Sequence, residues 1–385
     1  MKRVIIAKII STGLIIPVLL LFLPVIPIYS EPPPVPHAFY GSLTINGEPA
    51  PVGTKVEARV GDTLACTRIT TVAGQYGSSG AINPKLIVQG DIEPGALISF
   101  WVNGVDTGQT YPIQSGAVIE FDLALVVEIV TFPDPNLEAV IREAIDKPEG
   151  DIYSPILESP TYLHAGGKNI SDLSGLEHCI NLENAYIRDN YISDLQPLAN
   201  LTSLRKINAY GNEISNLQPL AGLVNLEELL IESNQISDLQ PLANLINLRE
   251  LSLYNNQVSD LQPLSAINSL EELHLGHNEV SNLQPLSILT SLTNLKLHNN
   301  QVGSIEAIAG LTNLTSLELQ GNQVNDIAPL SGLTNLTWLE LDNNQISNVG
   351  ALANLTGLKK LSLSGNSISD ISPVSNLAAL KELRL

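Results

Sequence analysis

Three histidines and one glutamate in this 385-residue sequence have the chemistry of zinc ligands. His274, His277, His298 and Glu272 would approach one another if the segments that carry them are adjacent strands about 5 Å apart. Their spacing does not match a known metal signature, however, and exposed histidines are common on a variable surface. We therefore expect no metal site and no cofactor.

A column of short polar side chains recurs every 22 residues and could offer oxygen ligands to calcium. Such side chains more often accept hydrogen bonds from the backbone of their own turn, and we expect that role here. The column consists of Asp172, Asp194, Asn216, Asp238, Asp260, Asn282, Ser304, Asp326, Asn348 and Asp370.

No catalytic constellation is present in the sequence. It contains no GxSxG nucleophile motif, no phosphate-binding loop, no HExxH motif and no coherent pair of carboxylates. The Asn-x-Ser/Thr tripeptides, mostly NLT, follow from a repeated consensus, so they do not indicate glycosylation. We expect a protein that is not an enzyme.

An asparagine at every 22nd position marks a tandem repeat. Leu248, Leu251, Leu253 and Asn256 show the pattern L-x-x-L-x-L-x-x-N, which is typical of leucine-rich repeats. One coil cannot bury its own leucines, whereas stacked coils share a continuous core. Strand centres spaced from Leu163 to Leu383 predict about eleven coils over residues 163–385, the first of them degenerate.

The repeated asparagines are expected to form a structural ladder. A buried Asn side chain offers two donors and one acceptor, which can satisfy backbone groups of its own coil and the next. The prolines of the DLQPL segments predict short 3₁₀ turns on a convex side, opposite a parallel β-sheet on the concave side. The ladder comprises Asn190, Asn212, Asn234, Asn256, Asn278, Asn300, Asn322, Asn344 and Asn366.

The segments before the repeats predict two further folded units. Residues 37–127 alternate polar and apolar side chains between turn signals, which indicates an antiparallel β-sandwich. Residues 130–162 are expected to form a helical N-terminal cap of the solenoid. Within it, Asp134 is placed to cap a helix in which Leu137 and Ile141 share an apolar face.

The N-terminus predicts export. Basic residues Lys2, Arg3 and Lys8 precede an apolar run, so residues 1–30 are interpreted as a signal peptide and the proline-rich residues 31–36 as a linker. We expect a secreted or cell-surface protein that contacts membrane only through an uncleaved signal segment. The formal net charge of −20 argues against a nucleic-acid partner. Cys66 and Cys179 are interpreted as two separate, mostly buried thiols.

The repeats and their cap resemble the internalin family of bacterial surface proteins. The resemblance rests on units such as NQISDLQPLANLINLRELSLYNN and on the preceding FPDPNLEAVIREAIDKPEGDIYSPIL. It implies a secreted or surface-attached protein that binds another protein on its concave face. The stretch YGSLTINGEPAPVGTKVEARVGD also resembles prealbumin-like or carboxypeptidase-regulatory-like sandwiches, which implies a spacer or adhesion module.

Positions 3, 5 and 7 of each repeat point onto the concave face and are free to vary. Tyrosine and tryptophan are typical anchors of protein interfaces, and the glutamates predict a ligand with a basic patch. The predicted binding residues are Tyr210, Glu228, Glu232, Glu250, Tyr254, His274, His298 and Trp338.

We therefore expect an acidic, exported binding protein whose leucine-rich solenoid recognises a protein or glycan. The alternative is a structural envelope or matrix protein that associates with itself. Residues 380–385 end in mid-repeat with uncovered leucines, which predicts a missing C-terminal cap and either a truncated chain or self-association through that end.

Overall fold

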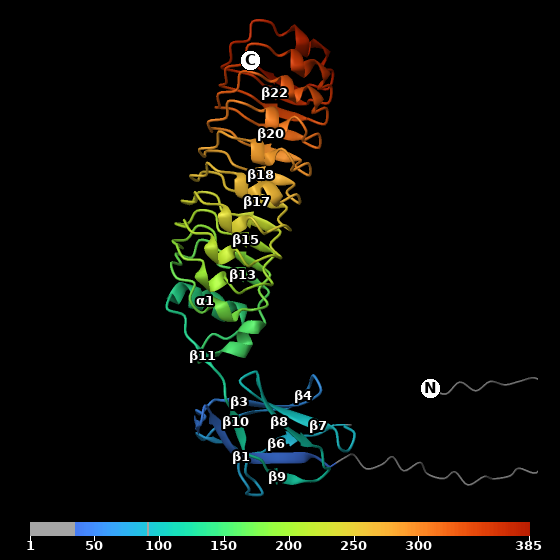
Figure 1. The fold of residues 1–385 in the computed structure, drawn as a ribbon. Helices are drawn as coiled ribbons and strands as arrows, with labels where there is room; N and C mark the ends of the chain where they lie inside the picture. The colour runs from blue at the N-terminus through green and yellow to red at the C-terminus, as the bar shows by residue number, and fades with distance from the viewer. Residues whose placement is uncertain (1–34, 91) are drawn as a thin grey trace, which may run out of the picture.

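The computed structural model describes residues 35–90 and 92–385. The predicted signal peptide and most of the predicted linker therefore lie outside the described residues. A β-rich unit is followed by an elongated stack of coils (Figure 1). This arrangement confirms the predicted fold class of a β-sandwich followed by a leucine-rich repeat solenoid.

The β-rich unit consists of two sheets that enclose Phe39, Leu43 and Phe100. The first sheet is antiparallel, with the order β4 (Thr63–Ile69), β3 (Lys55–Val60), β7 (Leu97–Val102) and β8 (Val105–Pro112). The second is organised around β1 (His37–Ile45), which pairs with β2 (Glu48–Pro49), β5 (Gln75–Gly77), β6 (Leu86–Val88), β9 (Val118–Glu120) and β10 (Leu123–Leu125). Unlike the predicted antiparallel pattern, β1 runs parallel to β9 and β10.

The cap joins the sandwich to the solenoid. It contains β11 (Ile129–Val130), α1 (Pro135–Ala144), β12 (Ile152–Tyr153) and the 3₁₀ helix η1 (Ser154–Glu158). Asp134 caps α1 by accepting hydrogen bonds from the backbone of Asn136 and Leu137, and its second oxygen accepts from the Ser171 N–H at 2.8 Å. Tyr153 packs in the sandwich core, so the two units share buried surface.

Eleven parallel strands form one in-register sheet, in which each strand residue pairs with the residue 22 positions away on the neighbouring strand. The sheet thus contains one strand for each 22-residue step along the sequence. The strands are β13 (Tyr162–His164), β14 (Asn184–Tyr186), β15 (Lys206–Asn208), β16 (Glu228–Leu230), β17 (Glu250–Ser252), β18 (Glu272–His274), β19 (Asn294–Lys296), β20 (Ser316–Glu318), β21 (Trp338–Glu340), β22 (Lys360–Ser362) and β23 (Glu382–Arg384).

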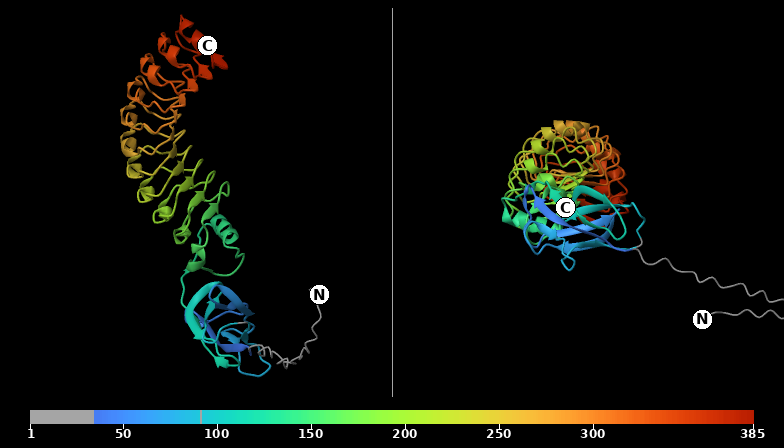
Figure 2. Two further views of the ribbon diagram at one scale, coloured as in Figure 1. Left: turned by 90° about the vertical axis from the view of Figure 1, so that its right-hand side faces the viewer. Right: turned by 90° about the horizontal axis from the view of Figure 1, so that it is seen from below.

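Short 3₁₀ turns follow the outer side of the curved solenoid (Figure 2). A turn of this kind is compact enough to close a 22-residue coil. The turns are η2 (Leu176–His178), η3 (Gln196–Leu198), η4 (Gln218–Leu220), η5 (Gln240–Leu242), η6 (Gln262–Ala266), η7 (Gln284–Leu286), η8 (Glu306–Ile308), η9 (Ala328–Gly332), η10 (Gly350–Asn354) and η11 (Ser372–Asn376).

Each of the nine repeated asparagines bonds its own coil and the preceding one. Asn256 is representative: Nδ2 donates to the carbonyls of Ile231 at 3.0 Å and Leu253 at 3.2 Å, while Oδ1 accepts from the Ile236 N–H at 2.9 Å. The side chains of the short polar column form Asx-type turns with the backbone. For example, Asp260 accepts a hydrogen bond from the Gln262 N–H at 2.8 Å. Both columns stabilise the backbone of the coils.

Both cysteines are free thiols. Cys179 is buried, as expected, and burial raises the pKa of its thiol to about 12. Cys66 is only half-buried, because it lies on β4 at the edge of the first sandwich sheet. None of the helices within residues 35–90 and 92–385 has the length and apolar character needed to cross a membrane.

Candidate functional site on the concave face

The eight predicted binding residues all lie on the concave strands or within two residues of them. The aromatic members are partly exposed: 41 % for Tyr210, 37 % for Tyr254 and 40 % for Trp338. Leucines such as Leu251, which alternate with these residues along the strands, are fully buried. The sheet therefore presents variable side chains on a scaffold that packing holds in place.

Two imidazole rings gather around Tyr254 in the middle of this face. The centroid of the Tyr254 ring lies 5.1 Å from that of His277 and 5.7 Å from that of His298, and the two imidazoles are 5.5 Å apart. Gly276 makes room for this arrangement, since a Cβ there would lie 2.4 Å from the His298 ring. We call Tyr254, His277 and His298 the central cluster.

A small hollow of about 240 Å³ adjoins the central cluster. Tyr210 and Glu232 contribute to its walls, and Ser252 is a buried lining residue, only 1 % exposed. Within the described chain, the Ser252 Oγ is buried without a hydrogen-bond partner, whereas the His298 Nδ1 lies 3.4 Å from the Glu318 carboxylate. An unpaired buried polar atom of this kind costs free energy in the folded state.

The carboxylates of the concave face are only partly compensated. The Lys206 Nζ lies 2.7 Å from the Glu228 carboxylate, and the Lys296 Nζ lies 3.8 Å from that of Glu318. Lys206 on the adjacent strand therefore compensates Glu228, one of the predicted binding glutamates. Among the described residues, Glu232, Glu250 and Glu272 form no ion pair with lysine or arginine.

The crowding of acids is visible in Glu250. Burial raises the pKa of this carboxyl, and the neighbouring Glu228 and Glu272 raise it further. Glu318 differs, because hydrogen bonding to His298 and the charge of Lys296 outweigh burial and lower its pKa. A positively charged group from a partner would relieve the repulsion around Glu250.

The histidines do not assemble into a metal centre. Within residues 35–90 and 92–385, no group of three or more His, Cys, Asp or Glu side chains is arranged to hold a metal ion. Burial, followed by the charge of Lys296, lowers the pKa of His274 and favours its neutral form. The His277 Nε2 lies 2.8 Å from the Asn299 Nδ2. His274 and His277 therefore contact polar side chains of the neighbouring coil on the concave face.

Trp338 stands apart from the central cluster. It lies on β21, four strands beyond β17, and the Lys360 Nζ is 3.7 Å from the centroid of a Trp338 ring. The same ammonium lies 2.7 Å from the Glu340 carboxylate. Trp338 therefore belongs to a separate local assembly, which the spacing of residues in the sequence did not distinguish.

A second aromatic group at the start of the solenoid was missed by the sequence analysis. The rings of Tyr162, His164 and Tyr186 have centroids 5.6 to 5.9 Å apart, with planes inclined by 10° to 30°. These residues occupy concave positions of the first two coils, and those positions could have identified them from the sequence. The first coil carries Lys168 in place of the ladder asparagine, so its variable positions were not read. We call these three residues the aromatic platform.

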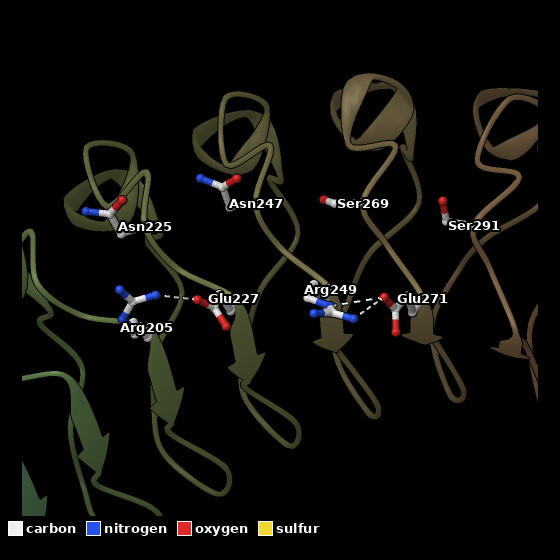
Figure 3. Close-up of a pocket in the computed structure, with 8 residues that line it drawn as sticks. All are labelled: Arg205, Asn225, Glu227, Asn247, Arg249, Ser269, Glu271 and Ser291. Carbon is white, nitrogen blue, oxygen red and sulfur yellow. Dashed lines mark hydrogen bonds and ion pairs between the residues drawn. The ribbon is translucent and has the colours of Figure 1, made fainter.

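A third feature lies on the flank beside the strands. Arg205 pairs with Glu227, and Arg249 pairs with Glu271, each at 2.5 Å across adjacent coils (Figure 3). These pairs line a hollow of about 540 Å³. A column of Asn and Ser side chains runs above them, and Asn247 donates to the Val224 carbonyl at 2.8 Å. Because its charges cancel pairwise, this flank offers less attraction to a charged ligand than the concave face does.

The family model described as Leucine Rich repeats (2 copies) matches residues 180–222, 224–266, 268–310 and 312–354. A single-copy model, Leucine Rich Repeat, matches residues 357–377. These matches cover the coils that carry the central cluster. No curated protein sequence matches the chain.

Solved structures of internalins from Listeria monocytogenes resemble this chain. The structure of an internalin (InlF) is 28 % identical with a TM-score of 0.54, and the alignment covers 66 % of this chain and 96 % of that one. The functional domain of InlJ is 22 % identical with a TM-score of 0.61, covering 67 % of this chain and 57 % of that one. An internalin C2 is 30 % identical with a TM-score of 0.44, covering 66 % and 93 %, respectively.

Proposed function

This chain belongs to the leucine-rich repeat family, and we propose that it is an exported binding protein that recognises a protein ligand through its concave face. Export is supported by the basic and apolar N-terminal segment of the sequence. The proposal assigns binding rather than catalysis, since the sequence contains no recognisable catalytic motif.

The observation that carries the proposal is the central cluster and its acidic surroundings. Tyr254 is a partly exposed aromatic residue on a rigid sheet, the kind of residue that anchors protein interfaces. The Ser252 hydroxyl beside it is buried and has no hydrogen-bond partner among the described residues. The uncompensated carboxylates of Glu232, Glu250 and Glu272 favour a partner with a basic patch.

The test is affinity capture from cell-surface extracts with the chain as bait. Because Tyr153 packs in the sandwich core, the bait should keep the sandwich. We expect the wild-type chain to retain a protein that Tyr254→Ala releases, whereas Gln262→Ala, an exposed change on η6, keeps it. Concentration-dependent filaments of the chain, with no foreign protein retained, would instead favour the self-associating matrix protein.

A further inference from the structure

The side chains of the aromatic platform are partly exposed to solvent. Its ring centroids are 5.6 to 5.9 Å apart while the ring planes differ by at most 30°, so the rings are laterally offset rather than fully overlapped. Tyr162 is 47 % exposed. The three rings, which have similar inclinations, therefore form one stepped aromatic surface beside a hollow of about 780 Å³.

The rim of this hollow supplies hydrogen-bonding groups of both kinds. Lys168 and Arg188 are donors, whereas Glu143 at the end of α1 is an acceptor. Gly166 leaves room for Arg188, since a Cβ at that position would lie 3.1 Å from the Arg188 Cγ. The Arg188 guanidinium is already paired with Asp189 at 3.3 Å.

The charges around the hollow cancel. Lys168 and Glu143 carry opposite charges, Arg188 is paired with Asp189, and Lys206 next to Tyr186 is paired with Glu228. The hollow therefore selects neither a cation nor an anion. Apolar ring faces bordered by donors and acceptors suit a neutral molecule that has an apolar face and polar edges.

We propose that the aromatic platform binds the ring of a neutral sugar. A pyranose has a face of C–H groups that can pack on Tyr162 and Tyr186, and its hydroxyls require both donors and acceptors. A proline-rich peptide also docks on aromatic side chains, but it lies in grooves between them. The three similarly inclined rings instead form a stepped surface with no groove between them. This site does not depend on the protein-binding central cluster.

Saturation-transfer NMR on the full chain tests this site. The probes are the methyl β-glycosides of glucose, galactose, mannose and N-acetylglucosamine. We expect transfer to at least one glycoside, strongest at the C–H protons of one ring face. Tyr162→Ala and Tyr186→Ala should each weaken the affinity by about fivefold or more, on the scale of one aromatic contact. Tyr162→Phe, which keeps the ring, should retain binding.

The control is Tyr254→Ala, which should leave glycoside binding unchanged because Tyr254 lies on another part of the sheet. Loss of captured protein in Tyr254→Ala with glycoside binding intact would separate the two sites. The proposal is overturned if no glycoside receives saturation, or if transfer persists in the Tyr162→Ala/Tyr186→Ala double variant. It is equally overturned if a hexaproline peptide binds the platform and no glycoside does.

Discussion

The side-chain amide nitrogen of Asn256, Nδ2, lies 3.0 Å from the carbonyl oxygen of Ile231, a residue 25 positions earlier in the preceding coil. The same side chain accepts from the Ile236 N–H at 2.9 Å. One asparagine thus joins two coils at the point where each strand ends, and its equivalents repeat the bond along the solenoid.

Replacing Asn256 with alanine should destabilise the fold. The change leaves the Ile231 carbonyl and the Ile236 N–H without these partners, at a cost of about 1–3 kcal/mol. Urea unfolding should show a lower midpoint than for Gln257→Ala, whose side chain is exposed. Asn255 is a poor control, because its φ of 55° makes alanine there unfavourable in its own right. Equal midpoints for the two variants would remove the structural role of the ladder.

Asp134 should make stability depend on acid pH. Burial alone would raise the pKa of this carboxyl, but backbone N–H donors from Ser171, Leu137 and others outweigh it and lower the pKa. Its contribution is therefore present above the unfolded pKa of about 3.9 and is lost as the pH falls through the lower folded value.

At pH 7, Asp134→Ala should lose about 1–3 kcal/mol through the missing cap and the missing bond to Ser171. The gap between its urea midpoint and that of the wild type should narrow toward pH 2. A gap that stays constant from pH 7 to pH 2 would show that the ionised carboxylate is not the stabilising form.

Glu250→Gln should separate stability from binding. The folded pKa of Glu250 is raised, so its ionised form opposes folding at pH 7 and this penalty vanishes below the unfolded pKa of about 4.3. Thermal unfolding at pH 7 should occur at a higher temperature in the variant, while affinity for a basic partner should fall. Glu271→Gln, which breaks the ion pair with Arg249, should not raise the melting temperature. A Glu250→Gln variant less stable than the wild type at pH 7 would contradict the repulsion of Glu250 by Glu228 and Glu272.

Salt should slow the association of the chain with its ligand. Glu232, Glu250 and Glu272 attract a basic surface over distances that a Debye length of about 8 Å limits at physiological ionic strength. Stopped-flow or surface plasmon resonance measurements should give an association rate that falls between about 50 and 500 mM salt, with a smaller change in dissociation. An association rate independent of salt would point to an apolar anchor alone.

Much of the fold could be predicted from the sequence because leucine and asparagine positions determine the geometry of each coil. Leu251 is buried and Asn256 bonds the preceding coil, because packing and backbone satisfaction leave few alternatives. The pairing of variable side chains was harder to predict. Whether Lys206 reaches Glu228, or the His298 ring fills the space left by Gly276, depends on rotamers of residues 22 positions apart.

The aromatic platform was overlooked for a related reason. Lys168 replaces the asparagine that marks the other coils, so the first strand seemed too irregular to carry a site. Its register with the second strand nevertheless places His164 opposite Tyr186. The backbone pairing of the first strand therefore keeps the geometry of the other coils even though its sequence lacks the repeat asparagine.

The most direct test of the central claim is the affinity of the captured ligand for Tyr210→Ala/Tyr254→Ala, measured by surface plasmon resonance. We expect the double variant to bind more weakly by about 1 kcal/mol or more and to unfold at the wild-type temperature, because both rings are partly exposed. Trp101→Ala, on the outer face of the sandwich near Arg59, should bind as the wild type does. Unchanged affinity in the double variant, together with loss in Trp101→Ala, would contradict recognition by the concave face and place it on the sandwich.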